Sequence, residues 1–182
     1  MNHKGTVTLT TDRLILRRYR IQDAEDAYRN WMASEEVTRY MMWPPYKSVD
    51  DVKSYIQSVI DCYGDDRYEW VIECKENHQA IGSIGAFNLN DTVASAEVGY
   101  CLSDRYWRRG IMPEALSAVI RYLFDEIGVN RIEATHDERN PASGRVMEKC
   151  GLRYEGTMRQ AGHNNQGVCN SVIRAILRDD RS

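Results

Sequence analysis

The stretch "YWRRGIMPEAL", residues 106–116, places two arginines, a glycine and a proline directly before a long amphipathic run. Pro113 suits the first turn of a helix, where its missing N–H is no loss. Gly110 allows close backbone approach or an unusual dihedral angle. A helix that begins here leaves backbone N–H groups free beside Arg108 and Arg109, which predicts an anion-binding site.

The segments on either side of this stretch predict a strand–helix–strand unit. The helix continues through "PEALSAVIRYLFDEIG" (113–128), with apolar residues at helical spacing and Gly128 as its stop. "SAEVGYCLS" (95–103) and "RIEATHDE" (131–138) have the composition of strands. Such a unit forms a parallel strand pair with a right-handed crossover, and ligands favour the carboxyl ends of its strands. The predicted anion site lies at one of those ends.

The rest of the chain supplies further strands and helices. Strands are predicted in "TVTLTTDRLILRRYR", "YEWVIECK", "AIGSIGAFNL", "RYEGTMRQAG" and "CNSVIRAILR". Helices are predicted in "QDAEDAYRNWMAS", in "SVDDVKSYIQSVIDCYG" with Ser48 as N-cap, and in "NPASGRVMEKCG" with Asn140 as N-cap. We therefore expect one α/β domain over residues 1–182, with a mixed, mostly antiparallel central sheet of about seven strands and four helices.

Composition narrows the functional classes. Of the 182 residues, 42% are hydrophobic and 28% are charged, as in a folded globular protein. A net charge of −3 argues against a general nucleic-acid binder. The five cysteines include no CxxC pair, so neither a disulfide framework nor a metal site is expected. No apolar run approaches membrane-spanning length, and "MNHKGTVTLT" lacks the apolar core of a signal peptide, which predicts a cytoplasmic protein.

The anion site matches neither of the two commonest nucleotide motifs. The chain contains no GxxxxGK[ST] phosphate loop, and "GSIGAF" (82–87) does not supply a GxGxxG fingerprint. Instead, "AEVGYCLSDRYWRRGIMPEAL" followed by "NRIEATHDERNPASGRVMEKCGLRYEG" strongly resembles the GNAT superfamily of N-acetyltransferases. Within that superfamily the chain looks most like the group that acetylates N-terminal amines of ribosomal proteins, which "TDRLILRRY" and "VIRAILR" also fit. The resemblance extends from about Thr10 to Leu177.

The resemblance implies that acetyl-coenzyme A is the cosubstrate. The superfamily's phosphate loop, Gln/Arg-x-x-Gly-x-Gly/Ala, falls on residues 107–112. Gly110 matches it, whereas Trp107 and Met112 depart from it at positions where backbone N–H groups do most of the binding. The coenzyme contacts that we expect are Cys101, Leu102, Arg108, Arg109, Gly110, Ile111, Met112, Pro113, Asn140 and Ser143.

Glu97 is the candidate general base. Strand alternation puts Glu97, Gly99 and Cys101 on one face of the strand that leads to the phosphate loop. In the superfamily an acidic residue near this position often works through water. The alternative is a strand carboxylate paired with a nearby arginine.

Ser143 is the candidate for the thiolate end of the reaction. In the similar ribosomal-protein enzymes, a serine in an N-P-x-S stretch lies beside the coenzyme's sulfur, and that stretch is here residues 140–143. The alternative is a capped helix start whose serine has no chemistry. Some relatives carry a base after "EG"; Gly162 stands in that place, and His163 is a substitute candidate against the alternative of a solvated loop histidine.

Three functions stay open from the sequence. The acceptor is expected between the first two helices and the last hairpin, near "YMMWPPY" (40–46). The first function is acetylation of a protein N-terminal amine, and the second is acetylation of a small amine such as an antibiotic, a polyamine or an amino acid. The third is a non-catalytic acyl-coenzyme-binding module. A monomer or homodimer is expected, with no nucleic-acid or membrane partner.

Overall fold

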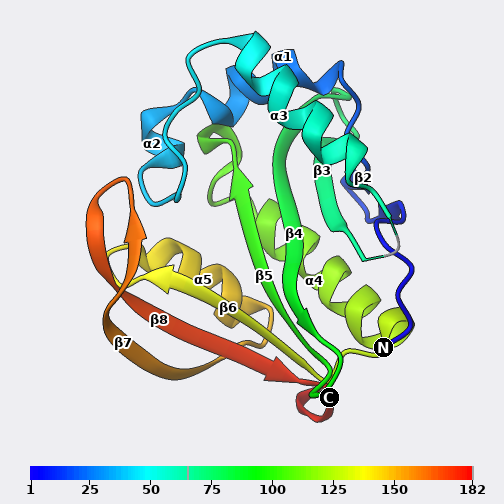
Figure 1. The fold of residues 1–182 in the computed structure, drawn as a ribbon, viewed down its shortest axis with the longest axis vertical. Helices are drawn as coiled ribbons and strands as arrows, with labels where there is room; N and C mark the ends of the chain where they lie inside the picture. Colours follow the sequence, from blue (N-terminus) through cyan, green and yellow to red (C-terminus); the bar gives the residue numbers. More distant parts are fainter. Residues whose placement is uncertain (65, 182) are drawn as a thin grey trace.

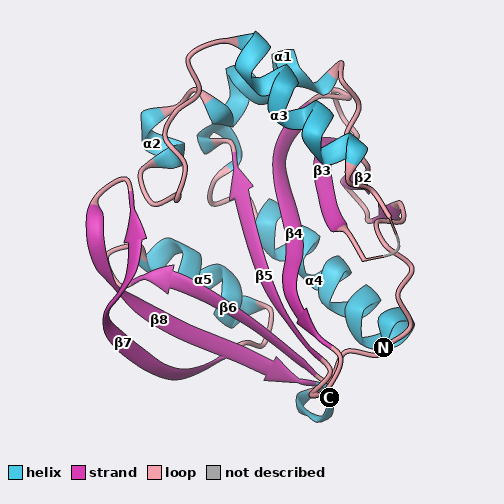
Figure 2. Cartoon of the chain, in the orientation of Figure 1, coloured by secondary structure: helices cyan, strands magenta, loops and turns pink. Residues whose placement is uncertain are grey.

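A computed structural model describes residues 1–64 and 66–181, which form an eight-stranded sheet in the order β1-β2-β3-β4-β5-β6-β8-β7 (Figures 1 and 2). The strands are β1 (Leu9–Thr10), β2 (Leu14–Arg17), β3 (Tyr68–Cys74), β4 (Ala80–Asn90), β5 (Ser95–Leu102), β6 (Arg131–Asp137), β7 (Arg153–Asn164) and β8 (Gly167–Leu177). The α-helices are α1 (Asp23–Ala27), α2 (Glu35–Thr38), α3 (Val49–Asp61), α4 (Ile111–Tyr122) and α5 (Pro141–Lys149). The expected mixed, mostly antiparallel α/β architecture is confirmed.

The expected numbers of strands and helices are each one too low. The first predicted strand is broken, because Thr11 N–H donates to the Leu14 carbonyl (3.0 Å) in a turn that folds β1 back onto β2. The extra helix is α2, whose N-cap Ser34 accepts from Val37 N–H. Two predicted helices change type before they end: α1 continues into a π-helical turn at Tyr28–Met32, and α4 continues into another at Leu123–Ile127, which Gly128 ends as predicted.

Two hydrophobic cores lie on opposite faces of the sheet. Val98 and Leu102 of β5 belong to the core that α4 covers, whereas Cys101 belongs to the core that α1 and α3 cover. The predicted alternation of this strand is therefore confirmed. The predicted caps are confirmed as well, because Ser48 begins α3 and Asn140 begins α5.

The parallel pair β5–β6 separates soon after it begins. Ladder pairs join Ser95–Glu97 to Arg131–Glu133 and go no further, although β5 runs on to Leu102 and β6 to Asp137. Figure 1 shows the two strands diverging from a common end, so that β6, β7 and β8 lean away from the rest of the sheet. This divergence opens the space in which the site lies.

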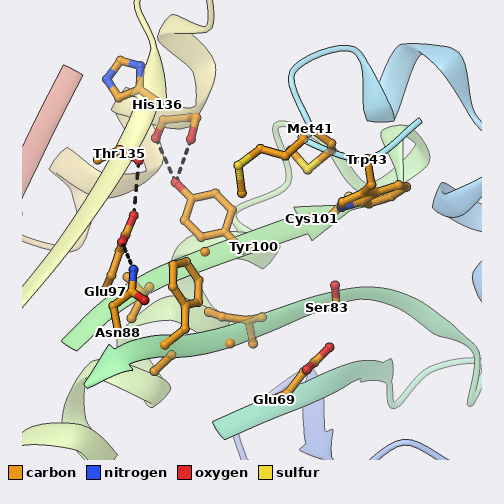
Figure 3. A pocket seen from close by; sticks show the side chains of 18 of the residues that line it. Met41, Trp43, Glu69, Ser83, Asn88, Glu97, Tyr100, Cys101, Thr135 and His136 are labelled. Atoms are coloured by element: carbon orange, nitrogen blue, oxygen red, sulfur yellow. Dashed lines mark hydrogen bonds between the residues drawn. The ribbon is translucent and has the colours of Figure 1, made fainter. Parts of the chain in front are cut away.

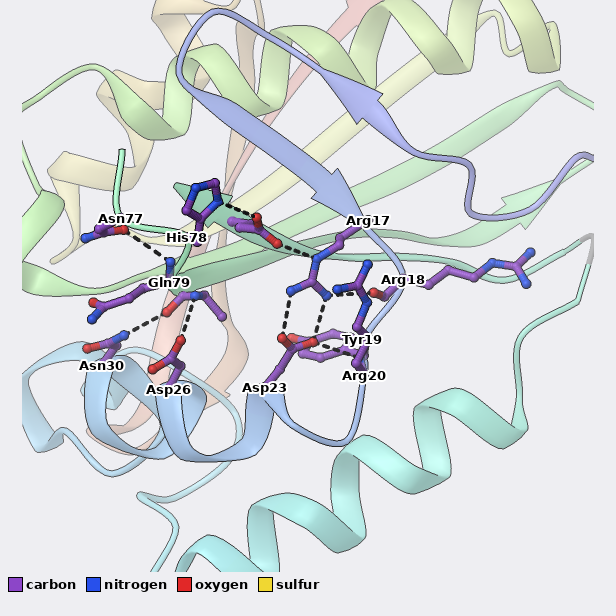
Figure 4. Close-up of polar contacts among 12 residues, drawn as sticks. Arg17, Arg18, Tyr19, Arg20, Asp23, Asp26, Asn30, Asn77, His78 and Gln79 are labelled. Carbon is purple, nitrogen blue, oxygen red and sulfur yellow. Dashed lines mark hydrogen bonds and ion pairs between the residues drawn. The ribbon is translucent and has the colours of Figure 1, made fainter. Parts of the chain in front are cut away.

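A buried ion cluster fastens α1 to strands β2 and β3 of the sheet (Figure 4). Arg17 of β2 donates to both carboxylate oxygens of Asp23 (2.7 and 2.9 Å) and to Glu73 of β3 (2.6 Å). The hydrogen bonds to Asp23 are the main reason why the pKa of Arg17 is raised above its ordinary value. Arg17 and Asp23 are both buried, so removing either side chain would leave the charge of the other without its partner in the protein interior.

Replacing Asp23 with alanine should lower the free energy of unfolding by about 3 kcal/mol, because Arg17 would keep a buried charge with one carboxylate fewer. Chemical denaturation measures the change. The control is Asp50→Ala, which removes an exposed i,i+3 partner of Lys53 and should change stability by less than about 1 kcal/mol. Equal effects of the two substitutions would contradict a stabilising role for the cluster.

Within the described residues, no helix combines the length and the apolarity needed to cross a bilayer.

Candidate active site

The divergence of β5 and β6 opens a cleft of about 1330 Å³. Its walls come from segments far apart in the sequence: the middle strands, the start of α5, the β7–β8 hairpin and the loop after α2. Figure 3 shows the side chains of the middle strands facing Met41 and Trp43 of that loop. Glu97, Cys101, Asn140 and Ser143 of the predicted site all line it. A cleft of this volume is large enough for a drug-sized ligand.

The floor of the cleft contains two carboxylates separated by glycines. Gly85 of β4 lies opposite both Glu69 of β3 and Gly99 of β5, and directly paired residues share a face of the sheet. Glu97 lies two residues before Gly99 and therefore shares that face. A Cβ atom at Gly99 would lie 3.0 Å from the ring of Phe87, so a larger residue there would displace that ring.

Glu97 has only neutral hydrogen-bond partners among the described residues. Asn88 Nδ2 donates to one carboxylate oxygen (2.9 Å) and Thr135 Oγ1 to the other (3.4 Å), as Figure 3 shows. Among the described residues, no arginine forms an ion pair with Glu97, whereas Glu69 is paired with Arg67. The alternative of a carboxylate held by an arginine therefore describes Glu69 and not Glu97.

Ser143 is joined to a tyrosine on β5. The Tyr100 hydroxyl lies 3.0 Å from the Ser143 carbonyl and 3.1 Å from Ser143 Oγ. Because a carbonyl can only accept, the phenol hydrogen goes to it, and Ser143 Oγ is left able to donate. Burial raises the pKa of Tyr100 far above its ordinary value, so the phenol stays protonated. Asn140 Oδ1 accepts from Ser143 N–H (3.3 Å), as expected of an N-cap.

His136 and His163 both line the cleft. His136 Nδ1 lies 2.9 Å from the Asp137 carbonyl, which can only accept, so Nδ1 carries a hydrogen. His136 Nε2 is buried without a hydrogen-bond partner among the described residues, and a Cβ atom at Gly144 would lie 2.7 Å from it. His163 is on strand β7 and not in a loop, and its side chain is exposed at the edge of the cleft.

The predicted anion loop has the backbone that the sequence suggested. Gly110 is the N-cap of α4 with φ +73°, in the left-handed region. Arg108, at φ +61°, is in that region too, and residues 108–110 are exposed. Within the described part of the chain, the N–H groups of Arg108, Arg109 and Gly110 have no hydrogen-bond acceptor.

A third arginine lies at this loop, and no sequence pattern pointed to it. Arg13, from the turn between β1 and β2, donates to the Arg109 carbonyl (2.9 Å) and to Glu114 in the first turn of α4 (2.6 Å). Arg109 in turn stacks over the ring of Tyr106, with 5.5 Å from guanidinium to ring centre. Arg13 therefore brings a guanidinium group to the start of the helix, next to the arginines of the loop itself.

The remaining predicted coenzyme contacts lie beyond the cleft lining, at the end of β5, in the loop after it and in the first turn of α4. The side chains of Leu102, Ile111 and Met112 are buried in the core, so only their backbone is available to a ligand there. Cys101 lines the cleft, but burial raises the pKa of its thiol to about 12. It therefore stays protonated near neutral pH, which argues against a thiolate nucleophile.

Among the residues that the structure describes, no group of three or more His, Cys, Asp or Glu side chains is arranged to hold a metal ion. All five cysteines are free.

Comparison with known proteins gives the family. Residues 13–153 match the family described as an acetyltransferase (GNAT) domain. The uncharacterized N-acetyltransferase YoaA of Bacillus subtilis is 37% identical over 171 residues, which are 93% of this chain and 96% of that protein. The ribosomal-protein-serine acetyltransferase of Escherichia coli is 26% identical over 140 residues, which are 76% of this chain and 78% of that protein.

Solved structures share the fold. A GNAT-family acetyltransferase from Bacillus anthracis superposes with a TM-score of 0.83 at 22% identity, covering 95% of this chain and 99% of that one. The microcin C7 self-immunity acetyltransferase MccE, solved in complex with acetyl-CoA and AMP, superposes with a TM-score of 0.80 at 21% identity, covering 92% and 93%. The family match and the fold agree: this chain belongs to the GNAT family and is an acetyltransferase.

Proposed function

We propose that this protein transfers an acetyl group from acetyl-coenzyme A directly to a primary amine. The proposed acceptor is the N-terminal amine of a protein, and specifically of a ribosomal protein. The observation that carries the proposal is the Glu97 carboxylate, which lies in the cleft with neutral donors on both oxygens and no cation among its described partners. The similarity to the ribosomal-protein-serine acetyltransferase of Escherichia coli supports the choice of acceptor.

The loop before α4 fits the diphosphate of the coenzyme. Exposed N–H groups at the left-handed Gly110, the positive end of the α4 dipole, and the guanidinium groups of Arg13, Arg108 and Arg109 all favour an anion. After Glu97, β5 is no longer paired with β6. The backbone N–H and C=O groups on this edge of β5 can therefore bind the amide groups of an extended chain such as the arm of the coenzyme. When bound, acetyl-coenzyme A supplies the acetyl group as a thioester.

Glu97 takes the proton of the acceptor. An amine is mainly protonated at neutral pH and attacks a carbonyl only as the free base, so a proton acceptor must lie near it. Asn88 and Thr135 each donate to one oxygen of Glu97 and thereby fix the direction of the carboxylate while leaving lone pairs for a water or the amine. Such fixed orientation favours proton transfer at one place in the cleft.

Ser143 donates a hydrogen bond at the other end of the reaction. Tyr100 gives its own hydrogen to the Ser143 carbonyl and stays a neutral phenol, which holds the first turn of α5 against β5. Ser143 Oγ–H, which donates to the Tyr100 oxygen (3.1 Å), turns about its C–O bond to donate to the departing thiolate and stabilises its charge.

Ser143→Ala should lower kcat by about tenfold and leave the affinity for acetyl-coenzyme A nearly unchanged, because one donor to the developing charge is lost. Thiol release measured under saturating acceptor gives kcat, and calorimetry gives the affinity. Tyr100→Phe is the companion variant: it keeps Ser143 Oγ and should reduce kcat less. A kcat of Ser143→Ala equal to wild type would remove the serine from the reaction.

The charges in the cleft suit a cationic acceptor. Among the described residues, its lining holds five carboxylates but one arginine, Arg67, which is already paired with Glu69. The carboxylates are Asp66, Glu69, Asp91, Glu97 and Asp137. Asp91 is paired with the N-terminal ammonium and Asp137 with Arg139, so the attraction for an ammonium group comes mainly from Glu97 and Asp66.

A panel of acceptors tests the proposal. Thiol release from acetyl-coenzyme A is measured with peptides that begin as ribosomal proteins do, with the same peptides blocked at the N-terminus, and with polyamines, amino acids and aminoglycosides. Turnover on free but not blocked peptides is expected. Turnover on small amines alone would overturn the acceptor, and coenzyme binding without turnover on any amine would overturn the transfer itself.

A further inference from the structure

The tip of the β7–β8 hairpin is fastened to the loop that follows α2. Asn165, at the tip, donates its backbone N–H to the Met41 carbonyl (3.1 Å). Its side-chain Nδ2 donates to the carbonyls of Thr38 and Trp43, at 2.8 Å each. One residue thus joins two segments more than 120 positions apart, which lie side by side in Figure 1.

The hairpin tip is itself held from below by a buried carboxylate. Asp137, at the end of β6, accepts from Asn164 Nδ2 (2.8 Å) and is paired with Arg139. The Asn164 side-chain oxygen accepts from Gln166 N–H (2.8 Å), which closes the turn. Asn165 is therefore presented on a rigid support that starts at the strand beside Glu97.

The loop on the other side has few other supports. It contains two prolines and no helix or strand between Arg39 and Lys47. Tyr46 N–H donates to the Met32 carbonyl (2.8 Å) at the far end of the loop. Among the described residues, Asn165 is the hydrogen-bond partner of Met41 and Trp43 that lies outside residues 34–47.

The segment that Asn165 holds forms a wall of the cleft. Met41 and Trp43 line the cleft from the loop, and His163 and Asn164 line it from the hairpin. Trp43 packs on Tyr46 with ring centres 5.8 Å apart, so its position fixes further apolar surface. The hydrogen bonds of Asn165 therefore join two segments of the cleft lining, one from the loop and one from the hairpin.

We propose that Asn165 is a positioning residue for the acceptor: it holds Met41 and Trp43 in the wall against which the amine-bearing chain packs. This inference rests on the proposed acetyl transfer and adds to it the residue that shapes the acceptor site. Asn165 touches neither Glu97 nor the anion loop, so it acts on acceptor binding and leaves coenzyme binding alone.

Asn165→Ala tests the proposal, since it keeps the backbone bond to Met41 and removes both side-chain bonds. Hydrogen–deuterium exchange of residues 38–46 should become faster by about tenfold, and KM for the acceptor should rise by about tenfold, while kcat and the calorimetric affinity for acetyl-coenzyme A stay within about twofold. Asn165→Asp should have at least the same effect, because a carboxylate cannot donate to a carbonyl.

The matched control is Gln166→Ala in the same turn, whose side chain has no hydrogen bond among the described residues. Exchange in 38–46 equal to that of this control would overturn the proposal, as would faster exchange with an unchanged acceptor KM. The exchange measurement needs no acceptor, so a failure of the bridge is distinguishable from a failure of the proposed function. Asn165 is exposed, and both variants are expected to fold.

Discussion

Glu97→Gln is expected to lower kcat by at least about 100-fold at pH 7, the range over which a positioned base contributes to catalysis. Glutamine has nearly the shape of glutamate, and its oxygen can still accept from Asn88 Nδ2, so the cleft keeps its form. What is lost is the ability to take a proton from the acceptor. Affinity for acetyl-coenzyme A, measured by calorimetry, should stay unchanged, because the anion loop lies elsewhere.

The pH dependence separates this role from a structural one. Without Glu97, the reaction depends on acceptor amine that is already deprotonated, and that fraction rises tenfold per pH unit below the amine's own pKa. The variant's rate should therefore climb steeply with pH and approach the wild-type rate at alkaline pH. A profile parallel to that of the wild type would eliminate Glu97 as the base.

Glu133→Gln is the matched control for this experiment. Glu133 is the ladder partner of Glu97 on β6, so the same charge is removed one strand away. Its carboxylate is paired with Arg131 and does not line the cleft. The substitution should leave kcat and the pH profile within about twofold of wild type.

The elements around the anion loop could be predicted from the sequence because their signals are local. Pro113 and Gly110 define the start of α4, Gly128 ends the helix with φ +86°, and Asn140 caps α5 through its own side chain. Each of these depends on neighbours within a few residues. The parallel pairing of β5 and β6 followed from the same order of elements, and it is confirmed.

The cleft itself could not be predicted from local pattern. It exists because β5 and β6 stop pairing after Glu97, which depends on the course of the whole sheet. Asn88 reaches Glu97 from a bulge where the β4–β5 register shifts and where its own φ is +51°. Simple alternation would place Asn88 on the opposite face from Phe87 and Glu97. Arg13 lies almost 100 positions before the loop that it supports, and no spacing rule connects them.

Gly110→Glu is expected to weaken acetyl-coenzyme A binding by at least about 100-fold, or about 3 kcal/mol. The substitution adds a negative charge where a diphosphate is proposed to lie, at the positive end of α4. A side chain at this position would also approach Arg13, since a Cβ atom there would lie 3.5 Å from its guanidinium. The new carboxylate would therefore compete with the ligand for Arg13, as Glu114 already does.

Gly110→Glu changes both the backbone strain and the charge at this position, and a control must separate the two effects. A glycine at the other end of the same helical segment provides that control. Gly128 directly follows the C-terminal end of this helical segment and has φ +86°. A Cβ atom at Gly128 would have no described neighbour within 4 Å. Gly128→Glu carries the same left-handed penalty, about 1–2 kcal/mol of stability, without approaching the anion loop. It should leave coenzyme affinity unchanged, and Gly110→Ala should reduce it only a few-fold. If Gly128→Glu weakened binding as much as Gly110→Glu, strain in the helix would explain the loss, and the exposed amides before α4 would no longer be the diphosphate site.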